Sequence, residues 1–156
     1  MATKLTKNFT LEECCYSDTA NAKKINNIPT DKAIIEKLKA VCVNVAQIVR
    51  EHYGKPVTVN SGYRGPELNK AVNGAKNSQH CKGEALDIEI KGISNYDLAL
   101  WIKNNLDFDQ LILEYADNLE KDINSGWVHV SYKSKAENRH QTLTINKHGT
   151  RVGLIK

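Results

Sequence analysis

The sequence predicts one α+β domain with a mostly antiparallel sheet and helices packed on one side of it. Three observations lead to this class. Helical periodicity follows Pro29 and runs to about Gly54, and strictly alternating strands occupy residues 84–90 and 127–132. The last residues, 140–156, have the pattern of a hairpin. Because helices precede most of the strands, an α+β fold is favoured over a parallel α/β fold.

The length and composition suit a single domain that covers residues 1–156. The chain has 156 residues, of which 40% are apolar and 26% are charged. A chain of this size buries roughly 68–70% of the surface that its unfolded form exposes. One hydrophobic core therefore suffices without disulfides or a structural metal, and a bound metal is free to serve chemistry.

The first predicted helix begins after Pro29, where Thr30 and Asp31 form a start signal. Apolar residues then recur at alternating steps of four and three positions, which is the spacing of one helix face. These residues are Ile34, Leu38, Val41, Val45 and Ile48. The pattern predicts a long amphipathic helix that ends near Gly54.

Shorter elements follow the long helix. Residues 56–60 predict a strand, residues 61–65 predict a turn, and Pro66 opens a short helix. Ser94 is the expected N-cap of a second long helix that runs to about Leu106. Further strands are expected at residues 110–114, 142–146 and 151–155, with a loop at 115–126.

The two alternating strands carry different residue types on their two faces. In residues 84–90, Leu86 and other aliphatic side chains form one face, and Asp87 points to the opposite face. In residues 127–132, valines form one face and His129 points to the other. Asp87 and His129 are therefore expected on the polar faces of their strands, away from the aliphatic layer.

Composition argues against several classes of function. The net charge of +4 is dispersed, without a block of like charges, so no nucleic-acid partner is expected. The longest apolar runs fall far short of the roughly 20 residues of a membrane span. The four cysteines include no CxxC pair and are expected to be reduced thiols. Residues 1–20 lack the apolar segment of a signal peptide, so we expect the chain to be cytoplasmic as synthesised. A monomer is expected.

Three residues have the chemistry of metal ligands: His80, Asp87 and His129. Zinc binds imidazole nitrogen and carboxylate oxygen in a tetrahedron, and a catalytic site uses three protein ligands so that water takes the fourth position. Gly83 allows a sharp turn between the first two residues. Spacing alone leaves the alternatives open, because each residue also suits an exposed loop, a cap or a satisfied core position.

Three phrases of the sequence together resemble one known family. They are Ser61-Gly-Tyr-Arg64, Ser78-Gln-His-Cys-Lys-Gly-Glu-Ala-Leu-Asp87 and Trp127-Val-His129. In order and spacing they are similar to the zinc D-alanyl-D-alanine carboxypeptidases, a family that includes VanX-like dipeptidases and phage L-alanyl-D-glutamate endolysins. Residues 78–87 match the family pattern SxHxxGxAxD without a gap. With the phrases at 8–13 and 108–112, which are similar to a phage and bacterial carboxypeptidase-like branch, the resemblance covers about residues 8–132.

The resemblance implies a hedgehog/DD-peptidase-like fold, one Zn²⁺ per chain and roles for particular residues. The zinc ligands would be His80, Asp87 and His129. Arg64 would hold the carboxylate or the polarised carbonyl of the substrate, a role that suits the planar, always charged guanidinium group. Ser78 and Trp127 would line the substrate site.

The general base is the point at which the sequence departs from the family. Much of the family has a glutamate three positions before the last histidine, where this chain has Gly126. Glu114 is similar to the glutamate of a branch with a longer insertion before the tryptophan and histidine. Antiparallel pairing of the two strands would set Glu114 beside His129. Glu114 is therefore the preferred base, ahead of Asp117 and Glu120.

The resemblance implies a zinc metallopeptidase that hydrolyses D-amino-acid-containing stem peptides of peptidoglycan. It would act as a D,D-carboxypeptidase or as a cell-wall endopeptidase. The expected lack of an export signal fits a phage lysin that reaches the host wall after release, and it also fits a cytosolic dipeptidase. Because the usual base is missing, the alternative is a non-catalytic module that holds zinc. Such a module would bind the cell wall or serve as a structural part of a virion. A basic nucleic-acid-binding domain is a third hypothesis.

Overall fold

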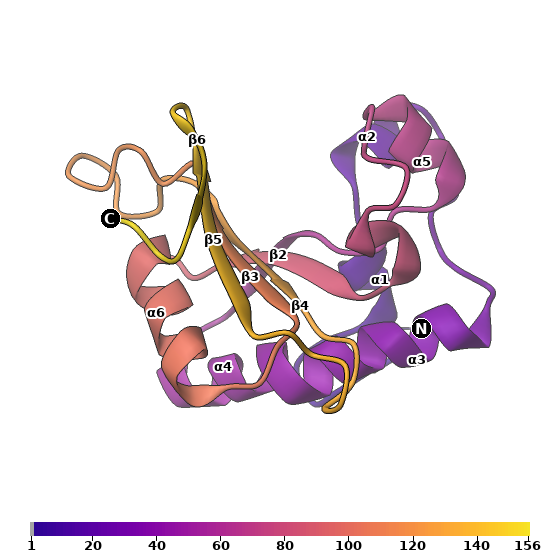
Figure 1. Cartoon of the computed structure of the whole chain (residues 1–156). Helices are drawn as coiled ribbons and strands as arrows, with labels where there is room; N and C mark the ends of the chain where they lie inside the picture. The colour runs from indigo at the N-terminus through magenta and orange to yellow at the C-terminus, as the bar shows by residue number, and fades with distance from the viewer. Residues whose placement is uncertain (1) are drawn as a thin grey trace.

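A six-stranded mixed sheet organises residues 2–156, which the computed structural model describes (Figure 1). The strand order is β1-β2-β4-β3-β5-β6. Every neighbouring pair is antiparallel except β3 and β5, which are parallel. The strands are β1 Thr58–Ser61, β2 Ala85–Glu89, β3 Gln110–Glu114, β4 Trp127–Ser131, β5 Gln141–Asn146 and β6 Gly149–Val152. The predicted α+β class with a mostly antiparallel sheet is confirmed.

Helices precede the sheet or lie between its strands. They are α1 Leu11–Cys15, α2 Asp18–Ala22, α3 Lys32–Val41, the π-helical η1 Cys42–Ala46, α4 Gln47–Tyr53, α5 Pro66–Ala71, the 3₁₀-helical η2 Gln79–Lys82 and α6 Asn95–Asn105. The sequence did not predict α1 and α2, because five residues are too few to show a helical period. Among the described residues, no helix combines the length and apolar character that a bilayer span needs.

The predicted long helix is the continuous run of α3, η1 and α4. Asp31 caps its start by accepting a hydrogen bond from the Ala33 N–H, and Gly54 ends it in a left-handed conformation. The expected apolar stripe is correct only as far as η1, because a π-helical turn inserts one extra residue into the helical repeat. Beyond this turn Val49 is fully buried, whereas Ile48, which the simple period placed in the stripe, is exposed.

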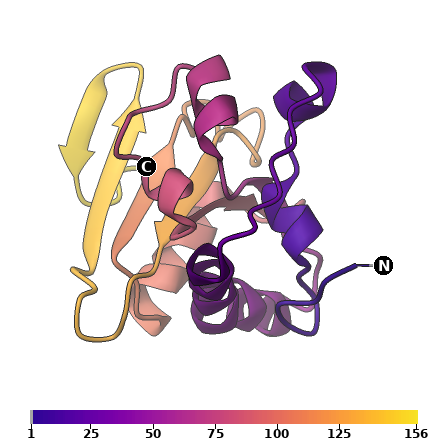
Figure 2. The ribbon, with the colours of Figure 1, turned by 90° about the vertical axis from the view of Figure 1, so that its right-hand side faces the viewer.

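The core lies between the long helix, α6 and one face of the sheet (Figures 1 and 2). Alternation in the strands decides which side chains enter it. The fully buried side chains include Leu38, Val41, Val45, Leu86, Ile88, Leu98, Ile102, Val128 and Val130. The predicted aliphatic faces of β2 and β4 therefore both face the helices, and the opposite faces of these strands are free to carry polar side chains.

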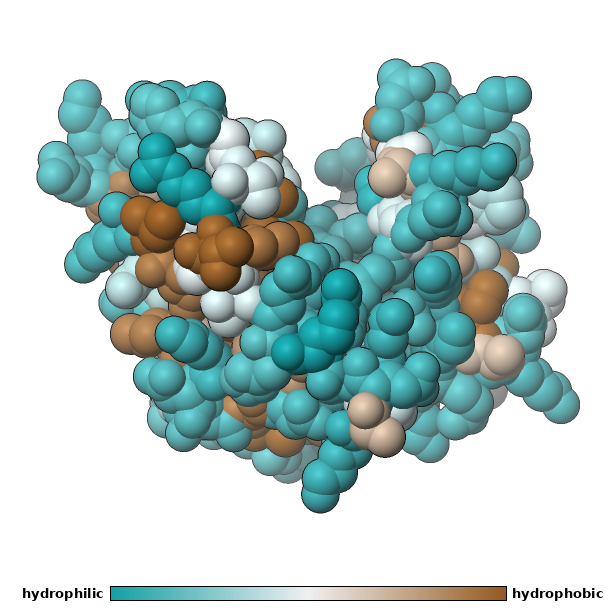
Figure 3. Space-filling view, in the orientation of Figure 1, coloured by the Kyte–Doolittle hydropathy of each residue, from teal (hydrophilic) through white to brown (hydrophobic). Residues whose placement is uncertain are grey.

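A cavity of about 640 Å³ lies on the polar side of the sheet. Strands β3 and β4 form one wall, and the segment before and within η2 forms another. In the space-filling view the molecule is deeply notched between the part that carries β5 and β6 and the part that carries α2 and α5 (Figure 3). Asp87 and His129 line this cavity, as their strand faces predicted.

Candidate metal and peptidase site

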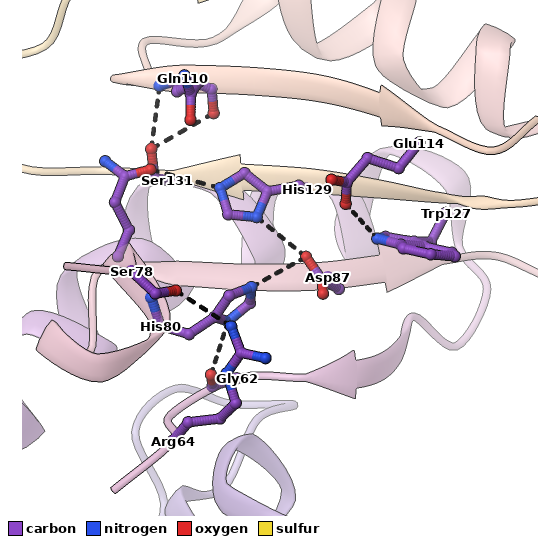
Figure 4. A network of polar contacts seen from close by, with 11 residues as sticks. Gly62, Arg64, Ser78, His80, Asp87, Gln110, Glu114, Trp127, His129 and Ser131 are labelled. Atoms are coloured by element: carbon purple, nitrogen blue, oxygen red, sulfur yellow. Dashed lines mark hydrogen bonds and ion pairs between the residues drawn. The ribbon is translucent and has the colours of Figure 1, made fainter. Parts of the chain in front are cut away.

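The three predicted metal ligands converge at one point of the cavity (Figure 4). Asp87 in β2 and His129 in β4 are directly opposite each other in the antiparallel pair. Asp87 Oδ1 lies 3.1 Å from His129 Nδ1 and 3.2 Å from Nε2 of His80, which comes from η2. The ligand atoms all lie within 4.8 Å of one another. The structure thus joins residues that are up to 49 positions apart in the sequence.

Local backbone geometry fixes the position of His80. Ser78 caps η2 by accepting a hydrogen bond from the His80 N–H, and Gly83 ends η2 with a φ of +76°. A Cβ atom at Gly83 would lie 2.9 Å from the Ile34 carbonyl oxygen, so this position requires glycine. The His80 ring donates from Nδ1 to the Gly62 carbonyl oxygen at 2.7 Å, because a carbonyl only accepts. Nε2 is therefore the nitrogen that faces the ligand cluster and is left to bind a metal.

The donor set fits a zinc ion. Two imidazole nitrogens and one carboxylate oxygen are the ligands of many catalytic zinc sites, which leave the fourth position open. Burial opposes ionisation of Asp87, but its hydrogen bonds with His129 and His80 lower its pKa below the ordinary value. The carboxylate is therefore ionised at neutral pH, as a metal ligand must be. The cavity also gives a substrate access to the cluster.

Glu114 lies on the same side of the sheet as the cluster. In the antiparallel β3–β4 pair, Glu114 is opposite Trp127 and Ile112 is opposite His129, so all four share one face. The Trp127 indole N–H donates to Glu114 Oε2 at 2.5 Å. Burial, with a further contribution from the charge of Asp87, raises the pKa of Glu114. A carboxyl group with a raised pKa is suited to proton transfer near neutral pH.

The alternative bases lie elsewhere. Asp117 and Glu120 belong to the loop after β3 and line other surface pockets, whereas Glu114 lines the cavity with the metal ligands. Gly126 occupies the position at which much of the family has its base, and its φ is +73°. A Cβ atom there would lie 2.1 Å from the Glu114 carbonyl oxygen, so the backbone leaves no room for a side chain. Position 126 therefore cannot carry a base in this fold.

Arg64 and Ser78 form the polar side of the cavity next to His80 (Figure 4). Arg64 Nη2 donates to Ser78 Oγ at 3.1 Å, and the Arg64 backbone N–H donates to the His80 carbonyl oxygen. Arg64 Nε is buried and has no partner among the described residues. The guanidinium group therefore keeps donors for an anionic ligand, while Ser78 orients it.

A second polar cluster, which the sequence did not predict, lies beside the site. Asp109, which is fully buried, accepts from the side chain of Arg139 at 3.0 and 2.8 Å and from Gln79 Nε2 at 2.8 Å. Burial raises the pKa of Asp109, but these hydrogen bonds outweigh it and lower the pKa to about 2. The segment 108–112 contributes to the family resemblance and includes Asp109, but the resemblance gave no role to this residue.

The lowered pKa of Asp109 makes a pH-dependent contribution to stability. A carboxyl group whose pKa falls on folding stabilises the protein above its ordinary value of 3.8, and this contribution is lost as the pH falls through about 2. Asp109→Asn should therefore destabilise the protein clearly at pH 6 and much less at pH 2. Urea unfolding of protein from which any metal has been removed beforehand measures both differences. An equal loss at the two pH values would contradict this account.

Comparison with known proteins agrees with the site. The family model of peptidase M15 matches residues 7–131, which include every candidate ligand and Glu114. The zinc D-Ala-D-Ala carboxypeptidase of Streptomyces albus G is 36% identical over 84 residues, which make up 52% of this chain and 31% of that protein. The chain thus spans about a third of the length of that relative. Because the family match extends over most of the sequence, the chain belongs to the peptidase M15 family.

Proposed function

We propose that the protein is a zinc-dependent peptidase that hydrolyses D-amino-acid-containing stem peptides of peptidoglycan. One observation carries this proposal: His80, Asp87 and His129 converge in an open cavity that also holds Glu114 and Arg64. The substrate class is supported by the similarity to a D-Ala-D-Ala carboxypeptidase. A phage lysin that acts on the host wall is the biological role that we propose for such an enzyme.

Each of these cavity residues has a separate role in hydrolysis. When bound, zinc supplies a Lewis acid that polarises the scissile carbonyl and acidifies a water molecule. Arg64 binds the substrate carboxylate and so fixes the position of the peptide bond. Glu114 accepts a proton from the attacking water and returns it to the amine that leaves when the C–N bond breaks. The Trp127 N–H holds one carboxylate oxygen of Glu114 and leaves the other oxygen for this transfer.

The proposal is tested by measuring bound zinc and bond cleavage in the same preparation. We expect one zinc ion per chain and either free D-alanine from D-Ala-D-Ala peptides or new amines from purified peptidoglycan. The first product identifies a carboxypeptidase and the second an endopeptidase. Chelation should abolish the activity, and added zinc should restore it. Bound zinc without cleavage of either substrate would overturn the enzymatic function.

The non-catalytic alternative loses its main support. It rested on the absence of a glutamate at position 126. The half-buried, hydrogen-bonded carboxyl group of Glu114 lines the same cavity as the metal ligands, which supports a base on β3 in place of one at position 126. A wall-binding module would have no use for such a group beside a zinc site.

A further inference from the structure

Gln79 connects the candidate metal site with the buried carboxylate of Asp109. It lies in η2 between Ser78 and His80, and its side chain reaches both neighbouring groups. Gln79 Oε1 lies 3.4 Å from Nε2 of His129, and Gln79 Nε2 donates to Asp109 Oδ2 at 2.8 Å. The His129 nitrogen that contacts Gln79 is the one that faces away from Asp87.

Charge and hydrogen-bonding capacity allow only one orientation of the Gln79 amide. An ionised carboxylate accepts hydrogen bonds and cannot donate them. Arg139 keeps Asp109 ionised through two side-chain hydrogen bonds, so the group that Gln79 directs at Asp109 must be its NH₂. Its carbonyl oxygen then faces His129. The reversed amide would set its oxygen against a carboxylate oxygen, and both are acceptors.

The orientation of Gln79 in turn selects the tautomer of His129. A carbonyl oxygen next to Nε2 is satisfied only when Nε2 carries the hydrogen. In the zinc-loaded protein, Nδ1 is then the nitrogen left to bind the metal beside Asp87 Oδ1. The Gly62 carbonyl selects the opposite tautomer for His80, whose Nε2 faces the cluster. The two histidines thus use different nitrogens, and a separate acceptor fixes each of them.

We propose that Gln79, held by Asp109 and Arg139, is a positioning residue that keeps His129 in the tautomer required for metal binding. The inference rests on the proposed zinc function and adds to it an outer shell that the sequence pattern does not specify. Groups that hydrogen-bond to a ligating histidine fix its tautomer and ring orientation, and their loss typically costs about 10- to 100-fold in metal affinity. Gln79 itself makes no contact with the metal in this arrangement.

The test measures zinc retention instead of catalysis. Zinc-loaded full-length protein is mixed with an excess of a chromophoric chelator, and the rate of zinc transfer is recorded. We expect Gln79→Met to release zinc about 10- to 100-fold faster than the wild type. Asp109→Asn should also release zinc faster, because an asparagine amide can donate to Gln79 and lets the Gln79 amide reverse.

Gln47 provides the matched control. It is a buried glutamine that bonds to Thr6 and Asn8 far from the cavity. Gln47→Met should lower stability without changing the rate of zinc release, which separates a metal effect from general loosening of the fold. A Gln79→Met protein that releases zinc as slowly as the wild type would overturn the inference.

The tautomer of His129 can also be measured directly in the wild-type protein, without any variant. Nitrogen-15 spectra of the histidine rings in the zinc-loaded protein should show His129 with its hydrogen on Nε2. A hydrogen on Nδ1 would overturn the inference. Failure of the wild type to bind zinc at all would instead refute the proposed function, so the two failures are distinguishable.

Discussion

Glu114→Gln is expected to lower kcat by about 10²- to 10⁴-fold while one zinc ion per chain stays bound. Glutamine has nearly the same shape as glutamate, and its oxygen still accepts the hydrogen bond from the Trp127 indole. It cannot accept a proton from the attacking water. Because Glu114 is a base and not a ligand, the variant should separate turnover from metal binding.

Two neighbouring acidic residues serve as controls for this loss. Asp117 and Glu120 lie in the loop after β3 and do not line the cavity of the metal ligands. Asp117→Asn and Glu120→Gln should therefore keep activity close to that of the wild type. Steady-state kinetics on whichever substrate the wild type cleaves, together with metal analysis of each preparation, provide the measurements. Unchanged kcat in Glu114→Gln would assign proton transfer to another group.

Asp87→Ala should lose zinc and, with it, all zinc-dependent turnover. Asp87 Oδ1 is the atom that both histidines approach, at 3.1 and 3.2 Å, so its removal takes one of three ligands and the centre of the cluster. The loss of zinc affinity should exceed the loss of about 10- to 100-fold that is typical when a group hydrogen-bonded to a metal ligand is replaced. His80→Ala and His129→Ala should behave in the same way.

Glu89→Ala is the matched control for the ligand variants. Glu89 lies on β2 two positions after Asp87 and on the same face, but its hydrogen bond goes to Asn60 on β1. Its replacement should leave one zinc ion per chain. Equilibrium dialysis followed by metal analysis measures the content of each variant. Full zinc retention in any ligand variant would exclude that residue from the metal ligands.

The face of each site strand could be predicted from the sequence, because the pleat of a strand fixes the alternation of its side chains. This rule set Asp87 and His129 on polar faces before their pairing was known. It could not show that these two residues lie directly opposite each other, because strand register depends on contacts between distant parts of the chain. Glu114 was reachable by combining alternation with an assumed antiparallel pair, which β3 and β4 form.

Other features lay beyond any local pattern. The π-helical turn η1 shifts the apolar stripe from Ile48 to Val49, and a regular period contains no sign of it. The contacts of Gln79 with Asp109 and of Asp109 with Arg139 join three segments that are about 30 residues apart from one to the next. Each residue alone is an ordinary polar residue of the sequence. Their common role follows only from their geometry.

The three ligands come from η2, β2 and β4, so no short stretch of the unfolded chain contains the site. A metal that binds only the folded chain draws the folding equilibrium toward the native state. At a free zinc concentration 100 times the Kd, this linkage adds about 2.7 kcal/mol to the free energy of unfolding. Zinc supply would then govern how long the protein survives heat and proteolysis, as well as whether it can cleave a peptide bond.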